Sequence, residues 1–234
     1  MDENHPSASE NGSRFDFDRI APGHDDWYDT PAGRLYDMLE RRGMAGALGD
    51  RRAGLLLDMG CGSGHWSSFF CFHGYTVYGT DISREMLRQA RARGSAGAYV
   101  VSDGCRLPFR TGCFDATVFV TSLEFVRDAA DALREAVRCT RRPGGRVVVG
   151  ALNAESGLNR RRKARRGGPY ASSAMFTAAQ LQHLLSGYGT AKVKVTAFVP
   201  ALLTAVPLLA RLYNRVMEAF RASSGDFLAG EVLL

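Results

Sequence analysis

The sequence predicts an α/β fold: a doubly wound sheet of seven strands, mostly parallel with an antiparallel terminal strand, and with helices on both faces. Two observations predict it. Short continuous apolar runs alternate with amphipathic segments of helical length, which is the pattern of βαβ units around a parallel sheet. A glycine-rich turn follows the first of these runs and leads into a helix. Among the 234 residues, 45% are hydrophobic, so we expect residues 14–234 to form a single domain after a polar, disordered tail over residues 1–13.

The segment before the sheet is expected to contribute a lid and one long helix. Residues 14–50 begin with aromatic and acidic residues and continue into an amphipathic pattern. Thr30 can cap a helix, and Pro31 suits its first position, because a proline there removes only an amide that has no helical partner. We therefore expect a helix over about 31–48.

Strands and helices then follow in alternation. The first strand, GLLLDM at 54–59, is an uninterrupted apolar run that ends in an acid and a glycine-rich turn. Ser83 can cap one of the following helices, and Thr177 and Gly187 mark the start and the end of a later one. The remaining strands are predicted at 75–80, 98–102, 114–120, 146–150, 191–198 and 225–233, and the helices at 65–73, 83–93, 126–141, 177–187 and 200–222.

The alternation breaks after the fifth strand. Residues 151–174 are polar and rich in arginine, and we expect them to form a loop within an arginine-rich cap insertion over 151–176. The run from Arg160 to Arg166 carries six positive charges, so it accounts for the whole net charge of +6. One local patch argues against a nucleic-acid partner, which would need a broad basic surface. The run is interpreted as a solvated, mobile loop, with recognition of a phosphate or carboxylate substrate, of RNA or of an anionic membrane as alternatives.

The composition favours a reduced, cytoplasmic protein. The first residues lack the apolar segment of a secretory signal. The five cysteines are odd in number and show no CxxC spacing, which favours neither a disulfide framework nor a zinc site. The longest uncharged run, 195–210, is shorter than the roughly 20 residues of a transmembrane helix. It is interpreted as core helix and strand, and docking of a lipid-like substrate or peripheral contact with a membrane stays open.

The turn after the first strand carries three alternating glycines, in the stretch from Asp58 to Gly64. Gly60, Gly62 and Gly64 let the backbone turn sharply and approach a ligand without a Cβ in the way. The helix that they open presents free N–H groups, which favour anionic or electron-rich groups. A ligand site is therefore expected at the carboxyl end of this strand, with Cys61 inside the loop.

An acid at the end of the next strand indicates a nucleoside. Asp81 lies 23 residues after Asp58, and a carboxylate there can accept hydrogen bonds from both hydroxyls of a ribose. The dinucleotide fingerprint GxGxxG would need glycine where this chain has His65. This difference disfavours a nicotinamide-dependent oxidoreductase.

The order and spacing of several landmarks resemble those of the class I S-adenosylmethionine-dependent methyltransferases. The landmarks are the DxGxGxG loop at 58–64, Asp81, the triplet Ser102-Asp103-Gly104, the pair Phe114-Asp115, and RRPGGR before the fifth strand. The resemblance covers about residues 26–150 and is strongest to the small-molecule branch that includes quinone-biosynthesis enzymes. It implies a Rossmann-like fold, S-adenosyl-L-methionine as cofactor and a small-molecule methyl acceptor, and it leaves the oligomeric state undetermined.

The resemblance also implies which residues bind the cofactor. In the family, the glycine loop lines the methionine part, and the acid before it orients the loop and faces the amino group. The acid of the second strand and its neighbour hold the ribose and flank the adenine, and the acid after the third strand binds the adenine with the backbone that follows. A residue past the fourth strand touches the sulfonium side, and aromatic residues before the first helix close a lid. The corresponding residues here are Trp27, Tyr28, Asp58, Gly60, Cys61, Gly62, Gly64, Asp81, Ile82, Asp103, Gly104, Cys105 and Thr121.

The implied chemistry leaves the acceptor open. Methyl transfer is an in-line displacement at an activated carbon, so the protein mainly aligns a nucleophile and excludes water. A general base is needed only for a weakly acidic hydroxyl or amine. Glu124, in the sequence TSLEFV, lies where an acceptor would approach. It is the candidate base or amine-binding carboxylate, with a polar residue at the start of a helix as the alternative.

Two alternative functions stay open from the sequence. An RNA or protein methyltransferase would use the same chemistry, but the tetrapeptide TSLE after the fourth strand lacks the NPPY-like pattern of enzymes that methylate nucleobase amines. A non-catalytic protein of the same fold that binds S-adenosylmethionine would keep the glycines and both acids.

Overall fold

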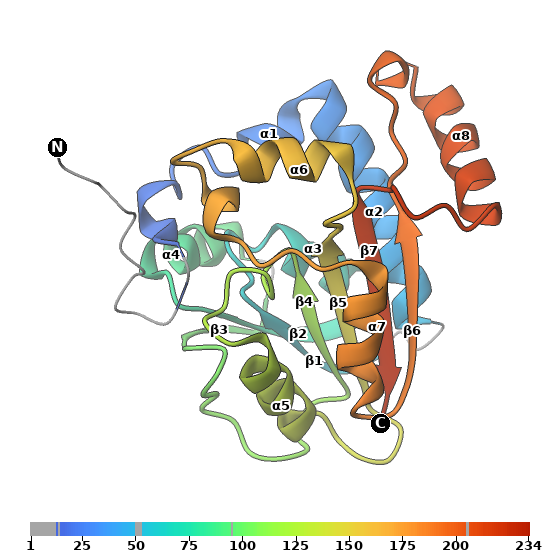
Figure 1. Cartoon of the computed structure of the whole chain (residues 1–234). Helices are drawn as coiled ribbons and strands as arrows, with labels where there is room; N and C mark the ends of the chain where they lie inside the picture. Colours follow the sequence, from blue (N-terminus) through green and yellow to red (C-terminus); the bar gives the residue numbers. More distant parts are fainter. Residues whose placement is uncertain (1–12, 14, 50–52, 95, 205) are drawn as a thin grey trace, which may run out of the picture.

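The structure is a computed structural model that describes residues 13, 15–49, 53–94, 96–204 and 206–234. These residues form one seven-stranded sheet with helices around it (Figure 1). The first twelve residues of the predicted tail lie outside the described residues. Ser13, the last residue of that tail, is described and pairs with Val126 in an isolated antiparallel bridge.

The sheet has the topology of a doubly wound fold. Its strands are β1 Gly54–Met59, β2 Tyr75–Asp81, β3 Ala98–Val101, β4 Ala116–Val120, β5 Arg146–Leu152, β6 Thr190–Thr196 and β7 Phe227–Leu233. They lie in the order β3-β2-β1-β4-β5-β7-β6, and β7 runs antiparallel to both of its neighbours, as predicted for the terminal strand. The order reverses between β1 and β4, where Met59 and Phe119 are register partners. At such a switch point the connections leave in opposite directions and open a crevice at the carboxyl edge of the sheet.

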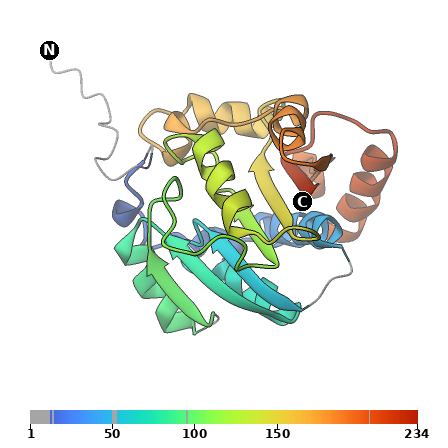
Figure 2. The same cartoon turned by 90° about the horizontal axis from the view of Figure 1, so that it is seen from below.

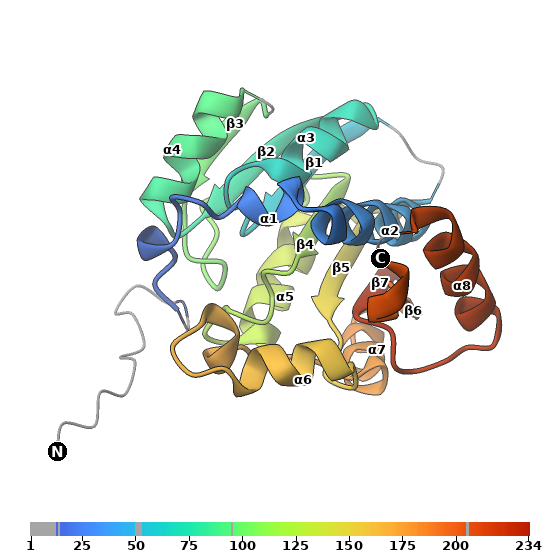
Figure 3. The ribbon, with the colours of Figure 1, turned by 90° about the horizontal axis from the view of Figure 1, so that it is seen from above.

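Helices cover both faces of the sheet (Figures 2 and 3). They are α1 Asp26–Asp29, α2 Pro31–Leu48, α3 His65–Phe72, α4 Arg84–Arg93, α5 Ala129–Cys139, α6 Gly157–Ala164, α7 Ala178–Ser186 and α8 Pro207–Ala219, with the 3₁₀ turns η1 Phe17–Arg19, η2 Pro169–Ser172 and η3 Ala201–Leu203. On one face, Leu39 of α2 and Phe70 of α3 pack into one apolar core. On the other face, Leu133 of α5 and Leu181 of α7 pack into a second core. The sheet is therefore buried on both faces, which explains its uninterrupted apolar strands.

The predicted helix caps are confirmed. The Thr30 side chain accepts a hydrogen bond from the N–H of Gly33, the third residue of α2, and the Ser83 side chain accepts one from the N–H of Met86, the third residue of α4. Thr177 and Gln180 form a reciprocal capping box at the start of α7. Each cap satisfies an N–H group that has no partner within its helix.

The loop predicted over 151–174 is wrong in part, because this stretch contains helix α6 and the turn η2. Ser156 caps α6, and the buried amide of Asn159 donates hydrogen bonds to the carbonyls of Asn153 and Asp226 at 3.1 and 2.8 Å. A helix that packs through a hydrogen-bonding side chain has no apolar periodicity for a sequence pattern to reveal. The first part of the arginine run therefore lies on a packed helix and not in a mobile loop.

The helix predicted over 200–222 is also divided. It consists of η3 and α8, and α8 begins at Pro207, which cannot continue a helix because it lacks a backbone N–H. The prediction that residues 195–210 belong to the core holds only for part of the run. Ala197 is buried, whereas Leu202 and Leu208 are exposed.

The N-terminal segment crosses the carboxyl edge of the sheet. In Figure 3, η1 and α1 run above the strands between α4 and α2. Asp18 accepts a hydrogen bond from the Ser83 hydroxyl at the start of α4. Asp25 accepts one from the Ser63 hydroxyl in the glycine loop, at 2.7 Å. These contacts hold the segment over the crevice of the switch point.

Candidate functional site

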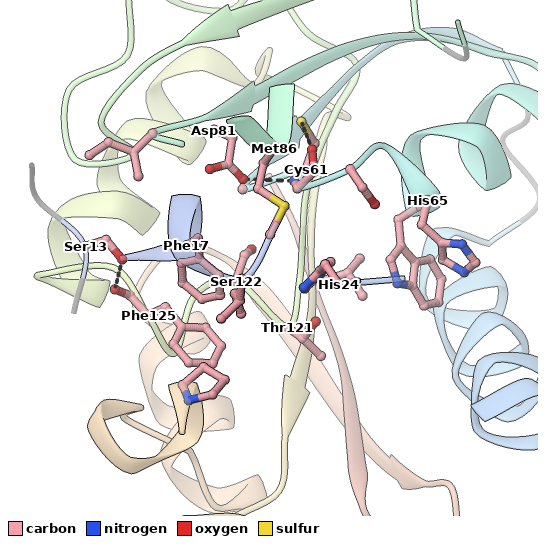
Figure 4. A pocket seen from close by; sticks show the side chains of 18 of the residues that line it. Ser13, Phe17, His24, Cys61, His65, Asp81, Met86, Thr121, Ser122 and Phe125 are labelled. Atoms are coloured by element: carbon pink, nitrogen blue, oxygen red, sulfur yellow. Dashed lines mark hydrogen bonds between the residues drawn. The ribbon is translucent and has the colours of Figure 1, made fainter. Parts of the chain in front are cut away.

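A cavity of about 540 Å³ lies at the carboxyl edge of the sheet. Its walls come from the loop after β1, the ends of β2 and β4, the N-terminal segment, α2, α6 and η2. Figure 4 shows side chains from the loop, from the N-terminal segment and from the end of β4 gathered around it. Its size suits a small organic molecule, and its place is the switch point where doubly wound folds bind ligands.

The loop after β1 has a backbone shape that favours glycine. Gly60 and Gly62 have φ angles of +68° and +53°. The Gly60 N–H donates to the Thr80 carbonyl at 2.7 Å, which ties the loop to β2. A Cβ on Gly60 would lie 2.5 Å from the Cβ of Ser122, which follows β4. The loop therefore lies directly against the end of β4 and presents bare backbone to the cavity.

Gly64 differs from Gly60 and Gly62 because it lies against helix α4 and not at the cavity. It does not line the cavity, and it precedes α3 with a φ angle of +80°. A Cβ there would lie 2.8 Å from Oη of Tyr99 and 3.3 Å from Cα of Ala90 in α4. Gly64 is therefore needed for the packing of α3 against its neighbours.

Asp58 is buried at the end of β1 and lines the cavity. One carboxyl oxygen accepts a hydrogen bond from the Ser67 hydroxyl of α3 at 2.7 Å. Burial raises the pKa of Asp58 to about 7, and the nearby Asp81 carboxylate adds to this rise, while the hydrogen bond from Ser67 opposes it. Burial therefore favours the protonated form of this carboxyl compared with an exposed aspartate.

Asp81 faces the glycine loop across the cavity. Its two carboxylate oxygens accept hydrogen bonds from the N–H groups of Gly62 and Ser83, both at 2.9 Å. Burial raises its pKa, and the backbone N–H donors oppose that rise. Ile82, the next residue, also lines the cavity. Because each carboxylate oxygen can accept a second hydrogen bond, Asp81 can still bind hydroxyl groups of a ligand.

The loop after β3 supplies Asp103 and Gly104 to the cavity wall but not Cys105. One oxygen of Asp103 accepts the Cys105 N–H at 2.9 Å, and the other lies 3.4 Å from the Arg127 guanidinium. The Cys105 thiol points to the carbonyl of Asp128 instead, at 3.4 Å. Any part of Cys105 in ligand binding would therefore be indirect, through the orientation of Asp103.

Cys61 contributes its backbone to the loop, and its thiol packs beneath it. A Cβ on Gly79 of β2 would lie 2.8 Å from the Cys61 sulfur. Burial raises the pKa of the thiol well above its usual range. The thiol is therefore a packing group in its neutral form.

The N-terminal segment places aromatic rings and one histidine over the cavity. Trp27 and Tyr28 of α1 both line it, and Tyr28 stacks on His65 with ring centroids 3.7 Å apart. His24, which the sequence analysis did not single out, lies over the loop, since a Cβ on Gly62 would be 3.9 Å from its Nε2. Burial lowers the pKa of His24, so the imidazole is neutral at pH 7.

The end of the cavity between α2 and α6 contains charged and aromatic groups. Glu40 of α2 lines this end, and burial raises its pKa to about 8, against the opposing effect of Arg162. The Arg162 guanidinium of α6 lies 5.5 Å from the ring centroid of Trp27 and 5.4 Å from that of Tyr170. These distances are those of cation–π contacts. Lid and cap therefore meet through one arginine side chain.

The structure brings Thr121 to the cavity but not Glu124. Thr121 has a φ angle of +46°, a conformation rare for a β-branched residue, and donates its N–H to the Gly150 carbonyl at 2.7 Å. Glu124 is fully buried, accepts a hydrogen bond from Leu152 N with one oxygen, and has no described partner for the other. Burial raises the pKa of Glu124 to about 7. This geometry argues against the predicted contact between Glu124 and a substrate.

Sequence reasoning missed Glu40 and Tyr170 of the α2–α6 end, and it named Arg162 only as a member of the arginine run, with recognition of an anionic substrate as an alternative. Glu40 follows Leu39 on a helix whose polar residues all resemble surface positions in the sequence. Arg162 and Tyr170 belong to a stretch that was predicted as a loop. For Glu40, the signal in the sequence is weak, because it is only an acid next to the apolar face of α2.

In sequence, the chain is similar to known methyltransferases. Residues 57–149 match a family model described as a methyltransferase domain. The chain is 39% identical over 113 residues to the demethylmenaquinone methyltransferase of Beutenbergia cavernae, which covers 48% of this chain and 47% of that relative. It is 36% identical over 105 residues to the malonyl-[acyl-carrier protein] O-methyltransferase of Pseudescherichia vulneris, which covers 45% of this chain and 41% of that relative. The chain thus spans about half the length of the curated relatives it matches.

In fold, the similarity extends over nearly the whole chain. A solved S-adenosylmethionine-dependent methyltransferase of Thermotoga maritima superposes with a TM-score of 0.72 at 23% identity. The match covers 93% of this chain and 97% of that one. It includes the segments before residue 57 and after residue 149 that the family model leaves out.

Proposed function

We propose that this chain, which has the domain and the fold of the class I S-adenosylmethionine-dependent methyltransferases, transfers a methyl group from S-adenosyl-L-methionine to a small-molecule acceptor. One observation carries the proposal. The bare backbone of Gly62 and the carboxylate of Asp81 face each other at the switch point and are joined by a 2.9 Å hydrogen bond. A ribose held there would lie beside the glycine positions of the loop, where no Cβ blocks the approach of a bulky nucleoside.

The residues present fit the nucleoside half of this cofactor. Asp81 retains acceptor capacity for two ribose hydroxyls after its bonds to Gly62 and Ser83. Asp103 and the backbone of Gly104 would bind the adenine, with Ile82 packing against it. All of these groups line the same cavity.

The other half would lie along the glycine loop. Gly60 and Gly62 would line the methionine part, and the Asp58 carboxyl would face its amino group. Thr121, at the end of β4, would lie on the sulfonium side. The left-handed backbone conformation of Thr121 is strained, and the packing around it offsets that strain.

In methyl transfer, the cofactor would supply the reactive methyl group, and residues of this chain would exclude water and accept a proton. S-Adenosylmethionine supplies, when bound, a methyl group on a positively charged sulfur. Trp27 and Tyr28 cover the cavity and exclude water. Glu40, which lines the same cavity, would accept the proton that the acceptor loses when its nucleophilic atom takes up the methyl group.

The α2–α6 end of the cavity is the place for the acceptor. Trp27, Tyr28 and Tyr170 supply aromatic walls, and Glu40 is a carboxyl group for which no hydrogen bond is found within the described part of the chain. Such a site suits a partly apolar molecule with one hydroxyl, amine or acidic carbon as nucleophile. Enclosure by α1, α6 and η2 favours a small molecule over a folded RNA or protein.

We further propose a cytoplasmic location for this reaction. The five cysteines are free thiols, of which Cys61 and Cys139 are buried. Free thiols persist in reducing compartments. Fractionation of cells that produce the chain would check this location, and recovery in a periplasmic or secreted fraction would contradict it.

Titration calorimetry with S-adenosylhomocysteine tests the cofactor assignment. We expect micromolar binding by the chain and at least a ten-fold weaker affinity for Asp81→Asn, since a hydrogen bond from a ribose hydroxyl to a charged acceptor contributes about 1.5–3 kcal/mol. Asp131→Asn on the exposed surface of α5 is the matched control and should bind as the unchanged chain does. Equal affinities for all three proteins would refute the ribose assignment, and the absence of binding at millimolar ligand would refute the proposal.

Transfer of labelled methyl groups tests the acceptor class. Separate pools of metabolites, lipids, RNA and proteins are incubated with the chain and labelled S-adenosylmethionine. We expect label in a small-molecule or lipid pool, and loss of that label with Asp81→Asn. Label confined to RNA or protein would replace the small-molecule assignment with the alternative.

A further inference from the structure

Helix α8 packs on the protein through its small and polar residues. Ala210 and Asn214 are its only buried residues, and the Asn214 side chain accepts the N–H of Phe198 at 2.9 Å. One turn later, Glu218 binds Lys194 and the hydroxyl of Thr196, both at 2.6 Å. The side of α8 that faces the protein is thus held by hydrogen bonds and by two ion pairs of Glu218, one with Lys194 and one, at 3.4 Å, with Arg42 of α2.

The opposite side of α8 is apolar and exposed. Leu208 is 74% exposed and Phe220, directly after the helix, 79%. The exposed apolar residues that we call the α8 face are Leu208, Leu209, Leu212, Tyr213, Val216 and Phe220. They recur at intervals of three and four residues, so they lie on one side of the helix. Leu202 in η3, which precedes the helix, is 91% exposed.

This orientation is the reverse of that of an ordinary surface helix. Apolar side chains at helical spacing normally face the core, and a contiguous exposed set of this kind marks an interaction surface. In Figure 3, α8 lies at the periphery next to α2 and β6, on the side of the molecule away from α4. Among the described residues, no other element packs over the α8 face.

The charges beside the α8 face are positive. Arg211 and Arg215 are exposed, lie one turn apart on α8, and form no ion pair with any described residue. Arg221 follows the helix. Glu218, the only acid of α8, is bound to Lys194 and turned toward the protein. The exposed side therefore combines a wide apolar surface with an edge of unpaired arginines.

We propose that α8 docks in the interface of an anionic lipid bilayer, with the α8 face among the acyl chains and Arg211 and Arg215 at the level of the phosphates. A helix with an apolar face flanked by basic residues binds membranes in this way, through apolar burial plus attraction to anionic headgroups. Among the described residues, no helix is long and apolar enough to span a bilayer. α8 would therefore lie in the plane of the surface.

The charges favour a lipid surface over a second copy of this chain. A two-fold pairing brings the same surface patch of both copies together. It would place the Arg211 and Arg215 side chains of two copies near one seam, while Glu218, the only acid of α8, is already paired with Lys194. An anionic surface supplies the missing negative charge and an apolar phase at once.

Co-sedimentation of the full chain with vesicles tests the proposal. Vesicles of phosphatidylcholine with phosphatidylglycerol are compared with vesicles of phosphatidylcholine alone. We expect the unchanged chain to bind the anionic vesicles. Its affinity for them should fall at least ten-fold with the double substitution Leu208→Ser plus Leu212→Ser. The affinity should fall about ten-fold with Arg211→Gln plus Arg215→Gln, and by a similar factor for the unchanged chain in high salt. All four positions are exposed, so the variants should fold.

The matched control is Phe72→Ser, since Phe72 of α3 is 89% exposed and lies outside the α8 face. It should bind vesicles as the unchanged chain does, and all variants should keep their affinity for S-adenosylhomocysteine. Absence of vesicle binding by the unchanged chain, or equal binding by the α8 variants, would overturn the proposal. A dimer in sedimentation velocity that Leu208→Ser plus Leu212→Ser abolishes, without vesicle binding, would assign the face to a second copy. The proposal does not depend on methyl transfer, so its failure leaves the proposed function intact.

Discussion

Three buried carboxyl groups have raised pKa values. Burial raises the pKa of Glu40 to about 8, and it raises the pKa of Asp58 and that of Glu124 to about 7. Their positions differ more than their acidities. Glu40 and Asp58 line the cavity, whereas Glu124 is enclosed behind β4 and β5, with one oxygen on the Leu152 N–H. A shifted pKa alone would therefore not have located the site, because acid–base chemistry also needs a path to the reacting molecule.

Glu40→Gln should remove the pH dependence of methyl transfer. Because Glu40 has a pKa raised to about 8, it is mostly protonated below pH 8 and cannot accept a proton there. We expect the rate of the unchanged chain to rise as the pH passes through about 8, and the variant to lose this rise together with a rate factor of about 10²–10⁴. The measurement is the initial rate of label transfer between pH 6 and 10.

Glu155→Gln, at an exposed position of the cap, is the control for Glu40→Gln and should keep the unchanged profile. A Glu40→Gln profile that still inflects near pH 8 would move the proton-accepting role to another group. Asp58 would then be the next candidate, since it also lines the cavity.

Gly60→Ala should weaken cofactor binding without preventing folding. The new Cβ would meet Ser122 at 2.5 Å, and the φ angle of +68° disfavours alanine. We expect the dissociation constant for S-adenosylhomocysteine to rise at least ten-fold in calorimetry. Gly46→Ala is the matched control, because a Cβ at this position meets nothing within 4 Å. Alanine in place of this glycine should stabilise helix α2 by about 0.5–1 kcal/mol. Equal affinities of the two variants would show that the loop tolerates a side chain.

Among the secondary-structure elements, the lid and the cap are the ones that close the site. η1 and α1 come from the first thirty residues, and α6 and η2 follow β5, yet Figure 1 shows α1 and α6 at the same end of the sheet, and Figure 3 shows them apart from each other across that end. Arg162 joins them through its contacts with Trp27 and Tyr170. The acceptor end of the cavity therefore exists only when both elements are in place.

Asn159→Ala should loosen this cap. The variant removes one of the two hydrogen bonds at each of the buried carbonyls of Asn153 and Asp226, which keep the backbone N–H groups of Ser156 and Asn153 as donors. Because each lost hydrogen bond contributes about 0.5–1.5 kcal/mol, the free energy of unfolding should fall by about 1–3 kcal/mol. Urea denaturation at pH 7 measures the loss. Arg160→Ala, one residue further and exposed, should change the stability by less than about 0.5 kcal/mol. A similar stability for both variants would contradict the role given to the Asn159 amide.

For the molecule as a whole, raised carboxyl pKa values make stability depend on pH. A carboxyl whose pKa is higher in the folded than in the unfolded state stabilises the fold at low pH, and this contribution is lost as the pH rises through the folded value. For Glu124 the loss extends from about pH 4.5 to about pH 7. Asp58 loses its contribution over a similar range.

Glu124→Gln should prevent the loss of stability that the ionisation of Glu124 causes as the pH rises. The amide of glutamine cannot ionise, and its oxygen can still accept the hydrogen bond from the Leu152 N–H. We expect the variant to be more stable than the unchanged chain at pH 8 by up to about 2–3 kcal/mol, relative to their difference at pH 4.5. Urea denaturation at both pH values measures this difference. A constant difference between the two proteins would show that Glu124 does not ionise in this range, and loss of methyl transfer would restore it as a catalytic candidate.

The sequence by itself determined the order of the seven strands and of the helices between them up to β5, the caps at Thr30, Ser83 and Thr177, and the place of the glycine loop. These features are local, since each depends on a few neighbouring residues whose backbone preferences and spacing leave one arrangement favoured. Asp81 belongs with them, because the carboxyl end of β2 must lie beside that of β1 in a doubly wound sheet.

Only the tertiary structure decided the rest. It brought Glu40, Arg162 and Tyr170 from distant segments to one end of the cavity, turned Glu124 away from it, and folded α6 around the amide of Asn159. It also turned the apolar side of α8 outward, although the same apolar spacing in α2 faces the core. The physical reason is that a sequence pattern defines a face of a helix, whereas the neighbour that this face meets depends on the packing of the whole chain.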